Sequence, residues 1–305
     1  MGHNHRVTNL LILLTLGLIL MGVPRRTVAQ VRKSCPEGAT LKASAGLASQ
    51  GSLILTEVLL PKAATSKFSS QWDGHDMPLW QEGPTSGQLH GVLGIDLEKA
   101  PGTYEWAVSW PGAHGDAESC AVTIIVRAGK FPTERLKVDP QFVQPNPEQE
   151  KQAEEDSKKM RAIYDTVTPE RLWQGKFGLP LKNVTTGGNF GRRRVLNGEA
   201  RSPHSGVDFP APAGTAVFAS QSGKVVLAEG LYYSGNTVVI DHGYGIYTMY
   251  AHLSKIGVQA GQMVKAGEEL GEVGATGRVT GPHLHWGLTI NHARVNAMQI
   301  AQRQP

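Results

Sequence analysis

The clearest hydrophobic pattern in the chain is an alternation near the C-terminus, in the segment GPHLHWGLTI at residues 281–290. Apolar side chains occupy every second position there: Leu284, Trp286, Leu288 and Ile290. This period predicts a strand with one face buried in a core, so that His283 and His285 project together from the opposite face. The two histidines are either ordinary surface residues or part of a site, and the rest of the chain has to decide between these interpretations.

Glycine interrupts similar short alternations throughout the C-terminal part of the chain. We expect strands near residues 215–220, 223–229, 236–242, 246–253 and 283–290, with tight turns at the glycines between 257 and 277. Helical periodicity is almost absent from this region. Residues 176–305 therefore predict an antiparallel, glycine-rich β domain.

The N-terminal part also alternates, which predicts a second β domain at residues 30–130. The alternating segments are Leu89 to Leu97, Tyr104 to Trp110 and Cys120 to Val126. Their number and spacing most resemble an immunoglobulin-like β-sandwich. Cys35 and Cys120 are the only cysteines, and Cys120 lies on the apolar face of its strand, so we expect a disulfide between them if the protein is exported.

Residues 131–175 predict a linker with a charged helix between the two β domains. Prolines at 140, 145 and 147 precede the segment PEQEKQAEEDSKKMRAIYDTV. Met160, Ile163, Tyr164 and Val167 recur there at helical spacing, which indicates a solvated helix with one narrow apolar stripe, ending at Thr168-Pro169. The predicted fold class is thus mainly β, with a helical linker.

The first 29 residues resemble a secretory signal peptide. Basic residues precede an apolar run from Leu10 to Val23, and a small-residue cleavage site follows at Thr27-Val28-Ala29. The run is too short for a comfortable membrane span, although an uncleaved anchor is the alternative. We therefore expect an exported protein of the periplasm or cell envelope, with no stable membrane span after cleavage.

Charge is distributed unevenly along the expected mature chain. Residues 176–305 contain 12 Lys and Arg against 7 Asp and Glu, whereas residues 30–175 are net acidic. A mildly basic C-terminal domain suits an anionic polymer. The excess is too small, and clustered aromatic residues are too few, to indicate a nucleic-acid partner.

Five residues of the C-terminal domain could form a metal centre. His204 and Asp208 lie in SPHSGVDFPAP, whose prolines and glycine exclude a helix, and His252 lies in YTMYAHLS. Two imidazoles and a carboxylate are the donors that a catalytic zinc ion binds while keeping a position open for water. Of His283 and His285, one could ligate while the other lies beside the metal. His252, which the alternation places on one face with Thr248 and Tyr250, would be a second unligated imidazole.

The remaining histidines have simpler interpretations. We expect His75, His90 and His114 to be surface or loop residues, His242 to make a polar contact at a strand end, and His292 to be exposed in a turn.

Four segments in a fixed order resemble the lysostaphin/LytM-type zinc metalloendopeptidases over about residues 187–295. They are, along the chain, FGRRR, SPHSGVDFPAPAGTAV, GNTVVIDHGYGIYTMYAHLS and VQAGQMVKAGEELGEVGATGRVTGPHLHWGL. The resemblance implies that His204, Asp208 and His285 ligate one zinc ion and that His252 and His283 are the unligated catalytic pair. It further implies hydrolysis of peptide bonds in the stem peptides or cross-links of peptidoglycan. Asn296-Ala297 departs from the Asp-Pro found in many relatives.

Two other functions remain open at this stage. One is a wall-binding or amidase-activating protein whose metal site is occluded by residues 30–175. The other is a lipoyl- or biotin-carrier-like sandwich, suggested by VQAGQMVKAGEELGEVG, although no second half with a modifiable lysine is evident.

If the chain is a peptidase, the candidates for binding substrate carboxylates are Asn189, Arg192 to Arg194 and Arg278. The sequence predicts no particular protein partner.

Overall fold

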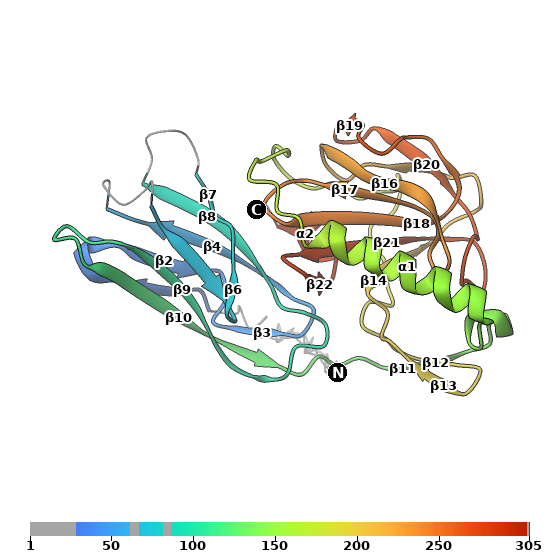
Figure 1. Cartoon of the computed structure of the whole chain (residues 1–305), viewed down its shortest axis with the longest axis horizontal. Coiled ribbons are helices and arrows are strands. Elements are labelled where there is room, and N and C mark those ends of the chain that lie inside the picture. The colour runs from blue at the N-terminus through green and yellow to red at the C-terminus, as the bar shows by residue number, and fades with distance from the viewer. Residues whose placement is uncertain (1–28, 62–66, 82–86, 304) are drawn as a thin grey trace, which may run out of the picture.

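A computed structural model of the chain describes residues 29–61, 67–81, 87–303 and 305. Almost all of the expected signal peptide lies outside the described residues. Figure 1 shows two β-rich bodies side by side, one built from the N-terminal third of the chain and the other from its C-terminal part. No helix in the described part of the chain combines the length and the apolar surface needed to cross a bilayer.

Two five-stranded sheets form the N-terminal body. The first has the order β1 (Val31–Ser34), β2 (Thr40–Ala43), β4 (Leu53–Leu59), β8 (Gln88–Gly94), β7 (Trp80–Gln81). The second has the order β3 (Leu47–Ser49), β10 (Ala117–Arg127), β9 (Gly102–Pro111), β5 (Ser69–Trp72), β6 (His75–Asp76). Side chains from both sheets share one core, as expected for a sandwich. The immunoglobulin topology itself stays a prediction.

The predicted disulfide is present between Cys35 and Cys120, whose Cα atoms are 5.8 Å apart. Cys120 is buried in the sandwich core with Val122 and Ile124, as the alternation of β10 requires. The bridge links the segment that follows β1 with strand β10. Cys120 lies 85 residues after Cys35 along the chain.

The C-terminal body is organised by one large antiparallel sheet. Its main order is β14 (Gly206–Pro210), β21 (His283–Ile290), β18 (Ile246–Ile256), β17 (Gly235–Asp241), β16 (Gly223–Leu231), β19 (Met263–Val264). At its margins β15 (Ala216–Phe218) pairs with β20 (Glu269–Val273), β20 with β18, and β22 (Ala293–Val295) with β21. All five strands expected here are present, with ends shifted by a few residues.

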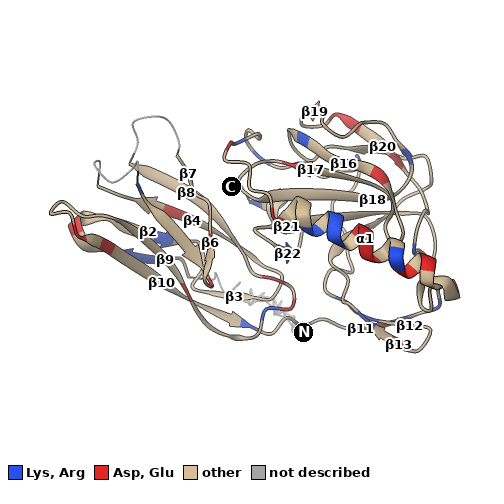
Figure 2. Cartoon of the chain, in the orientation of Figure 1, with Lys and Arg blue, Asp and Glu red and all other residues tan. Residues whose placement is uncertain are grey.

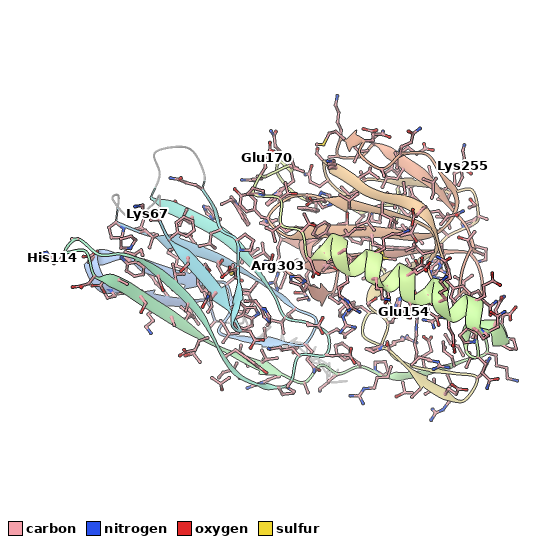
Figure 3. The ribbon with its side chains drawn as sticks, in the orientation of Figure 1. Lys67, His114, Glu154, Glu170, Lys255 and Arg303 are labelled. Carbon is pink, nitrogen blue, oxygen red and sulfur yellow. A yellow bond between two sulfur atoms is a disulfide. The ribbon has the colours of Figure 1, made fainter. Side chains whose placement is uncertain are left out.

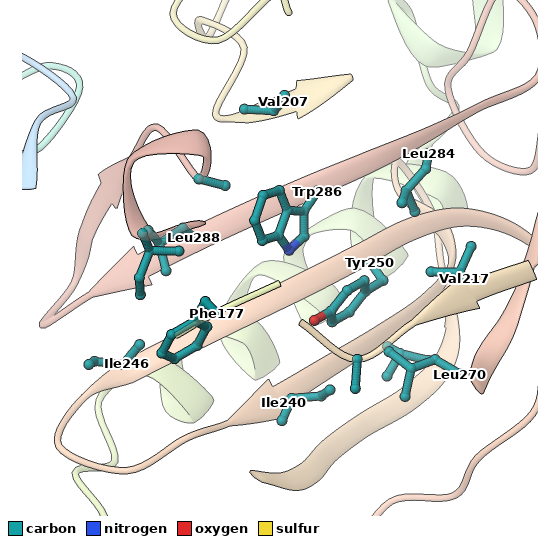
Figure 4. Close-up of a cluster of buried hydrophobic side chains, with 14 of the residues drawn as sticks. Phe177, Val207, Val217, Ile240, Ile246, Tyr250, Leu270, Leu284, Trp286 and Leu288 are labelled. Atoms are coloured by element: carbon teal, nitrogen blue, oxygen red, sulfur yellow. The ribbon is translucent and has the colours of Figure 1, made fainter. Parts of the chain in front are cut away.

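The apolar face of β21 lies in the main core of this body. Leu284, Trp286, Leu288 and Ile290 are at most 1% exposed, so the alternation seen in the sequence is confirmed. Figure 4 shows Trp286 on β21 and Tyr250 on the neighbouring strand pointing into the same cluster. Because the core fixes this face of β21, the opposite face can present polar groups in a defined position.

The expected linker is more structured than its prolines suggested. Residues Thr133–Leu136 form β11, which pairs in parallel with β12 (Arg193–Leu196), and β12 pairs with β13 (Glu199–Arg201). After a 3-10 turn at Pro140–Phe142, helix α1 runs from Pro147 to Tyr164. Residues 133–136 therefore contribute a strand directly to the C-terminal body.

Helix α1 begins at an Asn146 capping box and carries charged residues on the side facing away from the sheet (Figure 2). Met160, Ile163 and Tyr164 pack against the outer face of the sheet, as the narrow stripe predicted. The helix ends at Tyr164, earlier than expected, and Val167 is exposed beyond it. Buried Asp156 accepts a hydrogen bond from Tyr232 N (2.6 Å), which fastens the helix to the β16–β17 turn.

The sandwich contacts the C-terminal body at β22 and the short helix α2 (Met298–Gln302). Arg294 donates to both carboxylate oxygens of Asp96, at 2.7 and 3.0 Å, and the Arg294 backbone N–H donates to Asp96 at 2.9 Å. Asn296, the departure noted in the sequence, donates its N–H to the Gly51 carbonyl. Arg303, which lies between the two bodies in Figure 3, donates to the Leu53 carbonyl at 2.8 Å.

Replacing Asp96 with asparagine should loosen this contact. Burial by itself raises the pKa of Asp96, but its bonds with Arg294 outweigh this effect and lower the pKa. A lowered folded-state pKa means that the ionised carboxylate stabilises the contact above the unfolded pKa of about 3.9, and that this stabilisation is lost as the pH falls below it. Because both side chains are partly exposed, we expect Asp96→Asn to cost only about 1 kcal/mol at pH 7.

Denaturant unfolding with hydrogen exchange at residues 293–298 would measure this effect. Asp116→Asn, at an exposed position in the turn before β10, is the matched control. Equal stability of wild type and Asp96→Asn at pH 7, or a difference that grows in acid, would contradict the prediction.

Candidate metal centre and its groove

Strand pairing brings the first two candidate ligands together. β14 lies antiparallel to β21 in a register that places Asp208 directly opposite His285. Their neighbours Val207 and Phe209 face the core with Trp286 and Leu284, so Asp208 and His285 share the other face. Residues opposite each other in a ladder are close neighbours, and a carboxylate is thereby held beside an imidazole.

His204 reaches the same point from the loop before β14. His204 Nε2 lies 2.8 Å from His285 Nδ1 and 3.0 Å from Asp208 Oδ1, and His285 Nδ1 lies 3.2 Å from that oxygen. Donor atoms of a tetrahedral zinc site, with bonds of 2.0–2.1 Å, lie about 3.3 Å from one another. The three side chains thus already have nearly the mutual spacing that such an ion requires, and they form the one metal-ligand group of this kind among the described residues.

The surroundings set the protonation states that a metal needs. The His204 Nδ1–H donates to the Asn189 carbonyl at 3.0 Å, which leaves a lone pair on Nε2 for the ion. Burial lowers the pKa of His285 to about 4, opposed in part by its hydrogen bond to Asp208. Burial would raise the pKa of Asp208, but hydrogen bonds with His204 and His285 lower it far below its usual value. The lowered pKa values favour an ionised Asp208 carboxylate and a neutral His285 imidazole near neutral pH.

The side chain of His252 lies beside the cluster because of an irregularity in β18 that simple alternation did not predict. Tyr250 and Leu253 both face the core, with a register shift against β17 between them. His252 has a left-handed backbone (φ 64°), which turns its side chain away from the face of Thr248 and Tyr250. The expectation that His252 shares their face is wrong. This strained conformation instead directs the ring towards His283, with ring centroids 4.9 Å apart.

The two remaining histidines of the cluster have their Nδ1 atoms occupied. His252 Nδ1–H donates to the Thr276 carbonyl at 2.9 Å, and His283 Nδ1–H donates to the Gly281 carbonyl at 2.9 Å. These bonds leave the Nε2 atom of each ring directed away from the carbonyls, and His283 Nε2 lies 3.7 Å from Asp208 Oδ1. Burial, and then the neighbouring His285 and His283, lower the pKa of His252 to about 3. Both imidazoles are placed to accept a proton beside the three donors.

A groove crosses the cluster. One side is lined by Asp208, His252 and His283 together with Glu134 and Leu136 of β11, and the other side by His204 and His285 with Tyr233 and Met249. Among the described residues, none from positions 30–127 lines either side. The linker strand therefore forms a wall of the groove, and the sandwich leaves the groove open.

Outside the cluster, the histidines mostly follow expectation. His114 is exposed at the far tip of the sandwich (Figure 3), and His75 and His292 are exposed as well. His242 is fully buried after β17 and bonds Ser222 O and Thr248 Oγ1 at 2.8 and 2.7 Å. The expectation for His90 was wrong, because it is half-buried within β8 and its ring stacks on Trp80.

The site has features typical of a hydrolytic metalloenzyme. A buried carboxylate and two imidazoles converge on one point, and two further imidazoles lie beside them in an open groove. Comparison with known proteins agrees. Residues 202–297 match the profile of peptidase family M23. The C-terminal domain is therefore similar to the lysostaphin/LytM-type peptidases of that family. The match includes the segment VQAGQMVKAGEELGEVG, which had suggested the carrier interpretation.

Two named endopeptidases are similar to about a third of the chain. The chain is 49% identical over 112 residues to the peptidoglycan DD-endopeptidase ShyA of Vibrio cholerae, covering 36% of this chain and 26% of that protein. It is 45% identical over 102 residues to the DD-carboxypeptidase/endopeptidase Mpg of Neisseria meningitidis, covering 33% and 24%. The matches thus span about a quarter of these relatives.

One solved structure resembles most of the chain. A crystal structure of a proposed M23 peptidase from Pseudomonas aeruginosa aligns with a TM-score of 0.57 and 28% identity, covering 83% of this chain and 94% of that one. The alignment extends well beyond residues 202–297, so the arrangement of further elements around the peptidase domain is also shared in part.

Gly206 is required by the metal cluster, and Gly206→Ala should disrupt it. An added Cβ would lie 2.5 Å from His285 Nε2 and 2.9 Å from the Trp286 carbonyl, so the imidazole would be displaced from its two partners. We expect zinc affinity to fall about 10- to 100-fold, which is typical when the orientation of a ligand is lost. Competition with a chromogenic chelator would measure the affinity.

Gly188→Ala is the matched control, because its added Cβ would meet nothing within 4 Å although Gly188 bridges to Asp208. Zinc affinity of the Gly206→Ala protein equal to that of this control would show that His285 is not a ligand in its observed position.

Proposed function

We propose that the chain is an exported, zinc-dependent endopeptidase that hydrolyses peptide bonds in the stem peptides or cross-links of peptidoglycan. The observation that carries the proposal is the convergence of His204, Asp208 and His285 on one point beside a groove. The M23 domain and the peptidoglycan endopeptidases among its relatives supply the substrate class.

In this proposal His204 Nε2, Asp208 and His285 Nδ1 would hold zinc, which fits the spacing of the three donor atoms. Bound zinc would supply Lewis acidity, polarising the scissile carbonyl and activating water for attack. The buried Asp208 carboxylate compensates part of the positive charge, and the Asn189 side chain, which donates to Asp208 Oδ2 at 3.3 Å, orients that carboxylate.

His252 and His283 would move protons. Each presents an Nε2 lone pair towards the cluster while its Nδ1–H is held by a carbonyl. One ring can accept the proton released as water attacks, and a protonated ring can then donate to the developing oxyanion or the leaving amine. The rigid carbonyl contacts keep both rings in place without reorganisation during the reaction.

We place the protein in the periplasm or cell envelope on the strength of the sequence at residues 1–29 and the internal disulfide. Within it we infer an immunoglobulin-like accessory domain at 30–130, a linker with a helix at 131–175 and the peptidase domain at 176–305. The alternative of a binding or amidase-activating protein with an occluded site is weaker, because no described residue of the sandwich lines the groove.

Digestion of purified sacculi tests the proposal. The purified chain, with and without a zinc chelator, is incubated with sacculi, and the released fragments and new termini are identified by mass spectrometry. We expect chelator-sensitive release of peptide fragments. Zinc bound at one ion per chain without any new termini would favour the binding or activating protein instead.

Substitutions should separate metal binding from proton transfer. His204→Ala and Asp208→Ala should lose both zinc and hydrolysis, because each removes a donor. His283→Ala should retain most of the zinc and lose about 100-fold or more in rate, the contribution of a positioned acid or base. Metal analysis and fragment release on the same preparations compare the two losses. Tight zinc binding by His204→Ala would contradict the ligand assignment.

Zinc retention should persist into moderately acidic solution. The pKa of His285 is lowered to about 4 and that of Asp208 is also lowered, so neither donor gains a proton until the pH falls well below the value of about 6.5 usual for histidine. We expect zinc release, followed with a chelating dye, to have its midpoint below pH 5. A midpoint near 6.5 would show that the donors titrate as exposed groups.

A further inference from the structure

Two guanidinium groups border the groove on both sides of the metal centre. Arg194 on β12 and Arg278 in the loop before β21 line the walls on either side of the cluster. Arg194 is 19% exposed, and its Nη2 lies 4.0 Å from Asp208 Oδ2. Arg278 lies with its Cζ 4.5 Å over the ring of Tyr233. Both positive charges thus face the place where a bound peptide would lie.

The structure separates these two arginines from the other residues considered for carboxylate binding. Arg192 is paired with Glu134 at 3.2 Å, and Arg193 is exposed on the outer face of β12. Asn189 is engaged with both Asp208 and His204. Arg194 and Arg278 are therefore the members of that set whose charged groups remain available inside the groove.

Within the described residues, the positive charge of Arg194 is only partly compensated by the Asp208 and Glu134 carboxylates. Arg194 Nε is buried without a hydrogen-bond partner. Burial, and then the like charges of Arg194 and Arg201, lower the pKa of Arg278. The carboxylate within 4 Å of Arg194 is Asp208, which is already shared by two histidines and is the proposed zinc ligand. Cations whose charge is only partly compensated are costly in a partly dry groove, so their arrangement suits an anion that arrives with the substrate.

We propose that Arg194 and Arg278 form a subsite for a free carboxylate of the substrate, on the residue that supplies the leaving nitrogen at the scissile bond. This inference rests on the proposed peptidase function and adds the substrate class: branched or cross-linked peptides with a carboxylate beside the amide that is cut. A guanidinium fork binds the two oxygens of a carboxylate through parallel N–H donors, which an uncharged carboxamide cannot match. The subsite would orient the scissile carbonyl over the metal centre.

A matched pair of substrates tests the subsite. Two synthetic stem-peptide dimers differ in one group only: the carboxylate beside the cross-linking amide is free in one and a carboxamide in the other. We expect kcat/KM of the wild-type chain to favour the free carboxylate about 10- to 100-fold, the range for hydrogen bonds to a charged partner. Arg194→Gln and Arg278→Gln should each reduce that preference at least fivefold, chiefly by slowing the carboxylate substrate.

Arg193→Gln is the control, because it removes an arginine from the same strand on the face away from the groove. It should keep the wild-type preference. Zinc content and the rate on the carboxamide dimer show whether the groove variants are folded and loaded. Equal cleavage of both dimers by the wild type, or an unchanged preference in both groove variants, would overturn the subsite.

The outcome also distinguishes the subsite from general attraction to an anionic polymer. If the arginines only attract the polymer, Arg193→Gln and Arg194→Gln would reduce the preference equally, and added salt would abolish it in the wild type; either result overturns the proposal. Failure of the wild type to cleave either dimer, with zinc bound, would instead count against the proposed function itself.

Discussion

The pairing of β14 with β21 is the constraint on which the site depends. Its register sets Asp208 opposite His285, and it is held by the core residues Val207 and Phe209 on one strand and Leu284 and Trp286 on the other. A slip of one residue would turn the carboxylate into the core and the apolar side chains into the groove, so burial of the apolar face enforces the polar arrangement. The convergence of the candidate metal ligands is in this sense a consequence of how the hydrophobic core packs. His204 needs only a short loop before β14 to reach the same point.

Around this rigid pair, the other candidate residues of the site come from segments with less regular backbone. His252 lies at a bulge with a left-handed backbone, and its ring is aimed at His283 by a strained residue rather than by the regular pleat. β11, which precedes α1 in the chain, pairs with β12 and brings Glu134 to the wall of the groove. The contacts with the sandwich at Asp96 and Gly51 are made by Arg294 of β22 and by Asn296, and no described residue from positions 30–127 lines the groove. The groove thus stays accessible although the two bodies are in contact.

Local periodicity accounts for what could be predicted from the sequence. The alternation in β21 correctly gave both the buried face and the shared face of His283 and His285, and the apolar stripe of α1 identified its packing face. The side chain of His252 was placed on the wrong face, because a register shift against β17 depends on a partner strand that the local sequence does not reveal. β11 was missed for the same reason: its pairing with β12 joins residues about 60 positions apart. Likewise, only the fold shows that Arg194 faces the groove while its neighbour Arg193 faces solvent.

The central claim is that two imidazoles and a carboxylate, held in place by the strands of the sheet and the loop before β14, coordinate one zinc ion. Anomalous X-ray diffraction at the zinc absorption edge, on crystals of the zinc-loaded chain, measures this directly. The account predicts a single strong peak about 2.0–2.2 Å from His204 Nε2, an Asp208 carboxylate oxygen and His285 Nδ1, with His252 and His283 outside bonding distance. A peak coordinated by His252 or His283 in place of any of those three donors would contradict it.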